Sequence, residues 1–166
     1  MAASRVILRA SRWRFVPSIA LLPLMVAGCN QTAFPKAPAA GSQMSPAIVE
    51  PYLKIQEALA SDSVDEVKAN AGNLATAATA LGAPAMRIDT TALQLASFDD
   101  LADARTKFGA LSEAIDTYMT GLKLNPADGV RVAFCPMVQK PWLQKDGSLR
   151  NPYHGSEMLT CGSFRN

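Results

Sequence analysis

The feature that most constrains the fold is a three- and four-residue spacing of apolar side chains, which recurs between residues 45 and 124. At 3.6 residues per turn, this spacing places the side chains on one stripe of a helix. The two longest runs are Val64, Val67, Ala71, Leu74, Ala78 and Leu81, and then Leu101, Ala104, Phe108, Leu111, Ile115, Tyr118 and Leu122. Such stripes are buried against one another, so the sequence predicts a mainly α fold, an antiparallel four-helix bundle.

Residues typical of helix ends divide this region into four segments. Ser45 followed by Pro46 predicts an N-cap and a first helical residue, with Ile48, Tyr52, Ile55 and Leu59 on the buried face. The pattern Ser63-Val-Asp-Glu66 predicts a capping box for the second helix, which Gly82 closes. Residues 85–98 form a weaker third helix, and Asp99-Asp100 opens the fourth.

After residue 129 the apolar period changes from helical to alternating. Val130, Val132 and Phe134 alternate with Arg131 and Ala133, as in a strand. The turn residues Lys145-Asp-Gly-Ser148 separate Trp142-Leu-Gln144 from Leu149-Arg150. We therefore expect a small C-terminal β-hairpin that caps the bundle, with its turn at residues 145–148.

The N-terminus has the pattern of a bacterial lipoprotein signal. Four arginines precede the apolar run of residues 15–27, which is short and interrupted by proline. The run ends in Val26-Ala-Gly-Cys29, which resembles a lipobox. We predict a signal peptide over residues 1–28 and lipidation of Cys29, whose acyl chains would anchor the protein in a lipid membrane. The alternative is an ordinary signal peptide with an incidental cysteine.

These features predict the domain organisation and the location. Residues 29–44, rich in Pro, Ala, Gly and Ser, are expected to form a flexible tether, and residues 45–166 a single domain. The protein is expected in the cell envelope, facing the periplasm. Asn30 after the lipidated cysteine, in place of aspartate, favours the outer membrane.

The distribution of charge excludes one class of partner. Without the four arginines of the signal, twelve basic residues remain against fourteen acidic ones. Residues 45–124 hold six basic and eleven acidic side chains. Nucleic-acid-binding domains of this size usually present a basic face, so we do not expect nucleic acid as a partner.

Chemically distinctive residues gather between Val132 and Gly162. Cys135 and Met137 are two apart on an expected strand, and Met158 and Cys161 are three apart, so each pair can share a face. Thiolate and thioether are soft ligands that select Cu(I), so the spacing suggests a Cu(I) or Ag(I) site with His154 as an additional ligand. Zinc fits this set less well, because methionine is not among its usual ligands.

The same residues allow a second interpretation. In an oxidising compartment two cysteines usually pair, and a Cys135–Cys161 disulfide would stabilise the fold by about 3–4 kcal/mol. Met137 and Met158 would then be packing residues. A thiol oxidoreductase is disfavoured because no Cys-x-x-Cys motif is present, and no Ser-His-acid set or phosphate-binding loop indicates another enzyme.

Several short motifs carry a resemblance to a known family. They are Cys135-Pro-Met137, Trp142-Leu-Gln144, Asn151-Pro-Tyr153, Gly155, Met158 and Cys161-Gly162, preceded by Tyr52-Leu-Lys-Ile-Gln-Glu-Ala-Leu59 and the Phe108–Ala114 stretch. Over residues 46–162 the chain resembles a domain of formally unknown function. That domain occurs as secreted or lipid-anchored proteins and fused to periplasmic adaptor subunits of heavy-metal efflux pumps. The resemblance implies a helical bundle that serves copper or silver handling, with Cys135, Met137, Met158 and Cys161 as recurrent sulfur positions.

Overall fold

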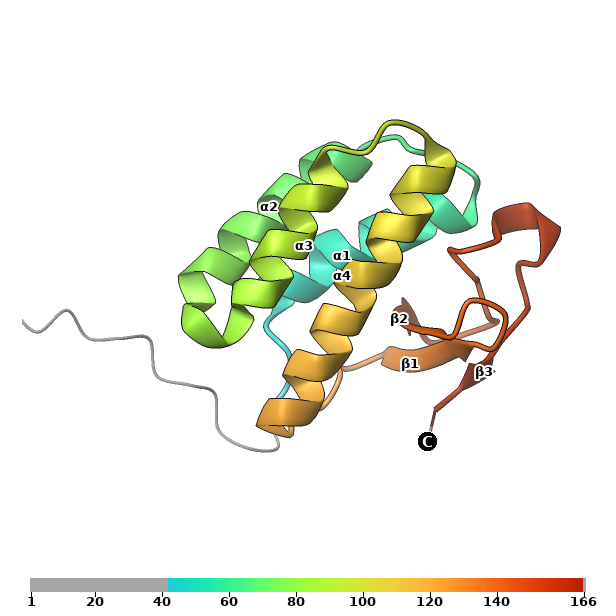
Figure 1. The fold of residues 1–166 in the computed structure, drawn as a ribbon. Coiled ribbons are helices and arrows are strands. Elements are labelled where there is room, and N and C mark those ends of the chain that lie inside the picture. The colour runs from blue at the N-terminus through green and yellow to red at the C-terminus, as the bar shows by residue number, and fades with distance from the viewer. Residues whose placement is uncertain (1–41, 166) are drawn as a thin grey trace, which may run out of the picture. The chain divides into compact units, whose positions relative to one another are not determined.

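Four α-helices make up most of the part of the chain that the computed structural model describes, residues 42–165 (Figure 1). They are α1 (Pro46–Ala60), α2 (Val67–Leu81), α3 (Met86–Ala96) and α4 (Leu101–Leu122), with a short 3-10 helix, η1 (Ala83–Ala85), between α2 and α3. The predicted mainly α class is confirmed. The predicted signal peptide, Cys29 and most of the predicted tether lie outside the described residues.

The helices begin largely where turn chemistry places them, with one exception. Pro46 occupies the first turn of α1, and the Asp100 carboxylate accepts a hydrogen bond from the Asp103 N–H at 2.8 Å, which caps α4. The predicted capping box is wrong. Ser63 Oγ accepts from the Asp65 N–H instead, and Glu66 has a left-handed backbone with φ 58°. Helix α2 therefore starts at Val67, three residues later than the capping box predicts.

Each helix packs against the next one in the chain, and the sheet packs against the first and the last helix. α1 packs on α2, α2 on α3 and α3 on α4, whereas α1 and α4 touch each other only sparsely. Strand β2 (Lys140–Lys145) packs against both α1 and α4. The predicted set of four helices is therefore present, but the predicted antiparallel bundle arrangement is not confirmed.

The sheet has three antiparallel strands in the order β2-β1-β3, with β1 at Val130–Cys135 and β3 at Ser163–Phe164. The predicted two-stranded hairpin is thus incomplete, and its turn is misplaced. β2 pairs with β1, from Val130 opposite Lys145 to Cys135 opposite Lys140. Residues 149–150 form no strand, because the Gln144 side chain takes the place of a strand partner: its Oε1 accepts from the Arg150 N–H and its Nε2 donates to the Ser148 carbonyl.

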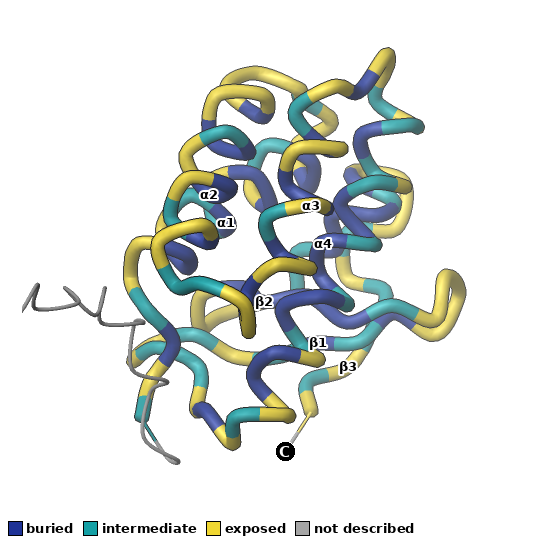
Figure 2. Tube along the Cα trace, turned by 60° about the vertical axis from the view of Figure 1, so that its left-hand side comes forward, coloured by how far each residue is buried: buried dark blue, intermediate teal, exposed yellow. Residues whose placement is uncertain are grey.

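One continuous core joins helices and sheet (Figure 2). Tyr52 of α1 and Phe108 of α4 lie with ring centroids 5.0 Å apart, and Trp142 of β2 meets Tyr153 edge to face at 6.0 Å. Met44 is also part of this core, with 1% of its surface exposed and its N–H bonded to the Asn125 carbonyl. The folded domain therefore begins a few residues before the predicted boundary at residue 45.

Candidate functional site

Strand pairing brings the two cysteines of the C-terminal region together. Cys135 is the last residue of β1, and Cys161 lies two residues before β3. Because Phe134 pairs with Ser163, the residues just beyond this pair lie at the same end of the two strands. Two thiols that are 26 positions apart in the sequence thereby become neighbours.

The two thiols are neighbours in a mostly buried setting. Both are free thiols in the structure, and they are close enough for Cys135 to influence the pKa of Cys161. Cys135 has no exposed surface, and Cys161 is half-buried. Burial raises the pKa of the Cys161 thiol, and the neighbouring Cys135 raises it further. The protonated thiol is thus favoured, which opposes the thiolate chemistry of redox enzymes.

Asn151 fixes the loop that carries Cys161. Its side chain is fully buried and donates to the Cys161 carbonyl at 2.7 Å, while its backbone N–H donates to the Leu159 carbonyl at 2.7 Å. The same side chain accepts from the Tyr153 N–H at 2.8 Å. Nothing in the sequence singles out Asn151 for this role, since Asn-Pro only indicates a turn.

The two methionines of the predicted metal site lie at the surface. Met137 is 64% exposed in the turn between β1 and β2, and Met158 is 40% exposed at the end of the short 3-10 helix η2 (Gly155–Glu157). Both differ from the fully buried Cys135. Met137 and Met158 are therefore neither core packing residues, as the disulfide interpretation expected, nor enclosed with Cys135.

His154, the proposed additional ligand, is half-buried beside η2. Its Nε2 is buried and has no hydrogen-bond partner among the described residues. Within residues 42–165, His, Cys, Asp and Glu side chains form no group of three or more that could hold a metal ion. His154 therefore does not join the two cysteines in such a group.

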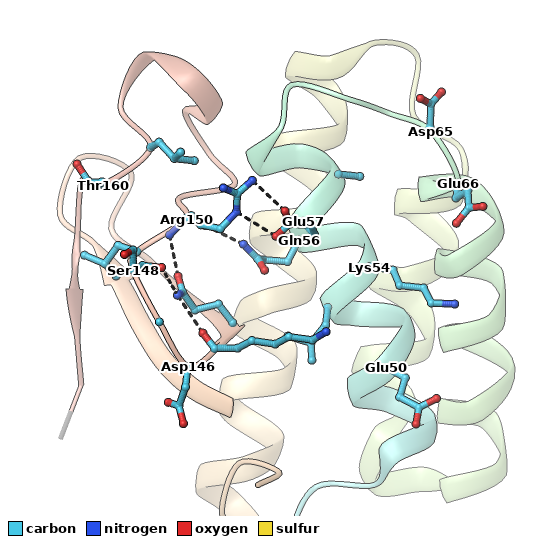
Figure 3. Close-up of a pocket in the computed structure, with 17 residues that line it drawn as sticks. Glu50, Lys54, Gln56, Glu57, Asp65, Glu66, Asp146, Ser148, Arg150 and Thr160 are labelled. Atoms are coloured by element: carbon cyan, nitrogen blue, oxygen red, sulfur yellow. Dashed lines mark hydrogen bonds and ion pairs between the residues drawn. The ribbon is translucent and has the colours of Figure 1, made fainter. Parts of the chain in front are cut away.

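A groove lies beside α1 (Figure 3). Neither Cys135 nor Cys161 is among the residues that line it. It encloses about 810 Å³, a volume in the usual range for binding clefts. Half-buried apolar side chains from three segments line it: Leu53 and Ala58 of α1, Leu149, and Leu159. No spacing in the sequence predicts this groove, because its walls come from segments far apart in the chain.

Arg150 joins the two walls of the groove (Figure 3). Its guanidinium binds the Glu57 carboxylate of α1 at 2.9 Å and donates to Ser61 Oγ at 3.0 Å. Its backbone carbonyl accepts from Gln56 Nε2 at 2.7 Å. The loop after β2 is thereby held on α1, although a pair this exposed adds little stability by itself.

Comparisons with known proteins do not assign the chain to a family. No family model matches the sequence, and neither a curated protein nor a solved structure is found to be similar to it. The family resemblance of the sequence motifs remains a prediction. Across residues 42–165, none of the helices is both long and apolar enough to cross a membrane.

Proposed function

We propose that this chain is an envelope lipoprotein that acts as a protein-interaction module, with its C-terminal sheet held closed by a Cys135–Cys161 disulfide. The lipobox-like sequence at Cys29 supports a lipid anchor. It also implies a location in the cell envelope, which is an oxidising compartment. One observation supports the disulfide: the pairing of Phe134 with Ser163 brings the two free thiols together, and Cys135 has no exposed surface.

The disulfide, which we call the staple, would stabilise the shortest strand of the sheet, β3. β3 has two residues and pairs with only Ala133 and Phe134 of β1. A cross-link next to this pairing closes the loop between the cysteines. It lowers the conformational entropy of the unfolded chain and thereby stabilises the folded state by about 3–4 kcal/mol. It would keep Leu149, Arg150, Leu159 and Thr160, which line the groove, in place beside α1.

Thermal unfolding tests the stapling role. In the full chain purified in detergent, we expect reduction to lower the melting temperature, and Cys135→Ser/Cys161→Ser to melt at the reduced temperature with or without reductant. Met137→Ser serves as the matched control, because this side chain is exposed and outside the pair. If reduction leaves the melting temperature of the unaltered chain unchanged, the pair is not a structural staple.

A second candidate function is a Cu(I) or Ag(I) site for a metal chaperone, a buffer or an accessory of a heavy-metal efflux system. The observation that favours it is the proximity of two soft thiols, with thioethers two and three residues away in the chain. Metal would have to displace both thiol protons, since thiolate is the binding form.

Anaerobic titration of the reduced chain with Cu(I) against a competing chelator tests this second function. A metal site predicts that Cys135→Ser/Cys161→Ser abolishes binding and that Met137→Ala/Met158→Ala weakens it. Equal and weak binding by the unaltered chain and the methionine double variant would exclude the four-sulfur site.

A further inference from the structure

The groove over α1 is elongated along the helix. It borders a second hollow of about 340 Å³, and the two share Glu50, Leu53, Lys145 and Asp146. The second hollow begins at Pro46, and the first reaches Ala58. At 1.5 Å per residue, the two together run about 18 Å along α1. This length suits a segment of polypeptide better than a compact small molecule.

The floor of the groove is apolar, and its rim has an excess of negative charge. Arg150 is neutralised by Glu57. Of the other charged side chains around the larger hollow, two are lysines, Lys54 and Lys145, and four are carboxylates, namely Glu50, Asp65, Glu66 and Asp146. None of these six side chains forms an ion pair with another described residue.

The carboxylates lie on both sides of the apolar floor. Asp65 and Glu66 stand at the turn before α2, whereas Asp146 stands on the opposite wall, in the loop after β2 (Figure 3). A complementary partner therefore carries apolar side chains at its centre and basic side chains toward its ends. Such charges guide association and select against acidic partners.

We infer that this groove binds a polypeptide segment of a partner protein, with leucine-like side chains on Leu53 and Leu149 and flanking lysines or arginines at the acidic rim. The geometry corresponds to the insertion of a short amphipathic segment into a groove, where apolar anchors supply affinity and charges supply specificity. The inference rests on the proposed interaction function and adds the chemistry of the partner.

Fluorescence anisotropy tests this inference on the full chain in non-ionic detergent, with empty micelles as the blank. The probe is a labelled leucine-rich peptide flanked by lysines, compared with the same peptide flanked by glutamates. We expect saturable binding of the lysine peptide and binding of the glutamate peptide at least about tenfold weaker. Equal affinity for both peptides would overturn the inference.

Two variants localise the binding. Leu53→Asn removes an anchor contact and should weaken the lysine peptide about tenfold. The matched control is Leu93→Asn, which changes an exposed leucine on α3 and should leave affinity unchanged. If both variants bind alike, the groove is not the site.

A charge-exchange variant tests the role of the acidic rim without changing the apolar residues of the groove. Asp65→Lys/Asp146→Lys alters only exposed side chains and should reverse the preference toward the glutamate peptide. An unchanged preference would contradict the role of the rim. If sedimentation instead shows a dimer that Leu53→Asn dissociates, a second copy of this chain is the occupant and the inference is overturned.

These outcomes are separate from those of the proposed function. If the chain with cross-linked cysteines does not bind the peptide, the inferred class of partner is wrong and the proposed disulfide still stands. A chain that binds the peptide but shows free thiols when isolated from the envelope would overturn the staple alone.

Discussion

The phenolic oxygen of Tyr52 on α1 lies 2.6 Å from the hydroxyl oxygen of Ser112 on α4, and it also accepts a hydrogen bond from the Leu143 N–H of β2 at 3.2 Å. One fully buried side chain thus joins α1 and α4 to the sheet. Burial raises the pKa of Tyr52, so the hydroxyl stays protonated at all ordinary pH values.

We predict that Tyr52→Phe lowers the free energy of unfolding by about 1–3 kcal/mol, because the buried Leu143 N–H loses its partner. Urea denaturation measures this change. Tyr118→Phe is the control, since Tyr118 is buried but its hydroxyl has no hydrogen-bond partner among the described residues. Equal effects of the two substitutions would show that the hydrogen bond from Leu143 contributes nothing.

Asp62 provides a pH-dependent link between α1 and η2. Hydrogen bonds from Ser156, and then from Arg105, lower the pKa of Asp62 from 3.8 to about 2. Since the folded state binds this proton less tightly than the unfolded chain, the contribution is fully present above a pH of about 4 and is lost toward a pH of about 2.

We therefore predict that Asp62→Asn is less stable than the unaltered chain at neutral pH, and that the difference disappears as pH falls through this window. Urea denaturation at a series of pH values measures it. Asp65→Asn is the control, because Asp65 forms no ion pair with another described residue and a surface change of this kind has little effect. A difference for Asp62→Asn that stays constant down to pH 2 would contradict the link.

Gly155 lies directly against the Asp62–Arg105 ion pair. Its φ is +57°, and a Cβ there would stand 1.9 Å from Asp62 Oδ1 and 2.2 Å from an Arg105 nitrogen. We predict that Gly155→Ala costs more than about 2 kcal/mol, combining backbone strain with overpacking.

The matched control for Gly155 is Gly129→Ala. Gly129 has φ +70°, but no atom lies within 4 Å of the added Cβ, so this substitution shows the backbone cost alone. Chemical denaturation of both variants measures the difference. Equal losses would mean that contact with the ion pair does not require a glycine at residue 155.

The sequence predicted the helices better than it predicted the sheet. Ile48, Tyr52, Ile55 and Leu59 are all fully buried, as their spacing on one helical face requires. That pattern is local, whereas the pairing of β3 with β1 joins Phe134 to Ser163, which are 29 positions apart in the chain. The turn residues at 145–148 suggested a hairpin, but the buried Gln144 side chain binds the following loop in place of a strand.

The candidate site was predictable only in part. The proximity of Cys135 and Cys161 was expected for both the metal and the disulfide interpretation, but the positions of the thioethers were not. Met137 falls in the β1–β2 turn and not within the strand, so the two-residue spacing no longer places it on the same face as Cys135. The groove depends on Arg150 joining α1 to the loop after β2, which no local pattern encodes.

Methionine oxidation distinguishes the two candidate functions. Met137 and Met86 are both 64% exposed, but Met86 lies on α3 and is not part of the cysteine region. In a stapled module we expect peroxide to oxidise both at similar rates, with or without Ag(I), as followed by mass spectrometry of peptides. Protection of Met137 and Met158 by Ag(I), with none at Met86, would favour the metal site.

Thiol counting on the protein isolated from the cell envelope tests the Cys135–Cys161 staple most directly. The sample is alkylated in denaturant, so that the burial of Cys135 does not matter, and is then reduced and alkylated with a second reagent. We expect both cysteines to carry only the second label, as members of one disulfide. If both carry the first label, the thiols are free in the envelope and the staple does not exist.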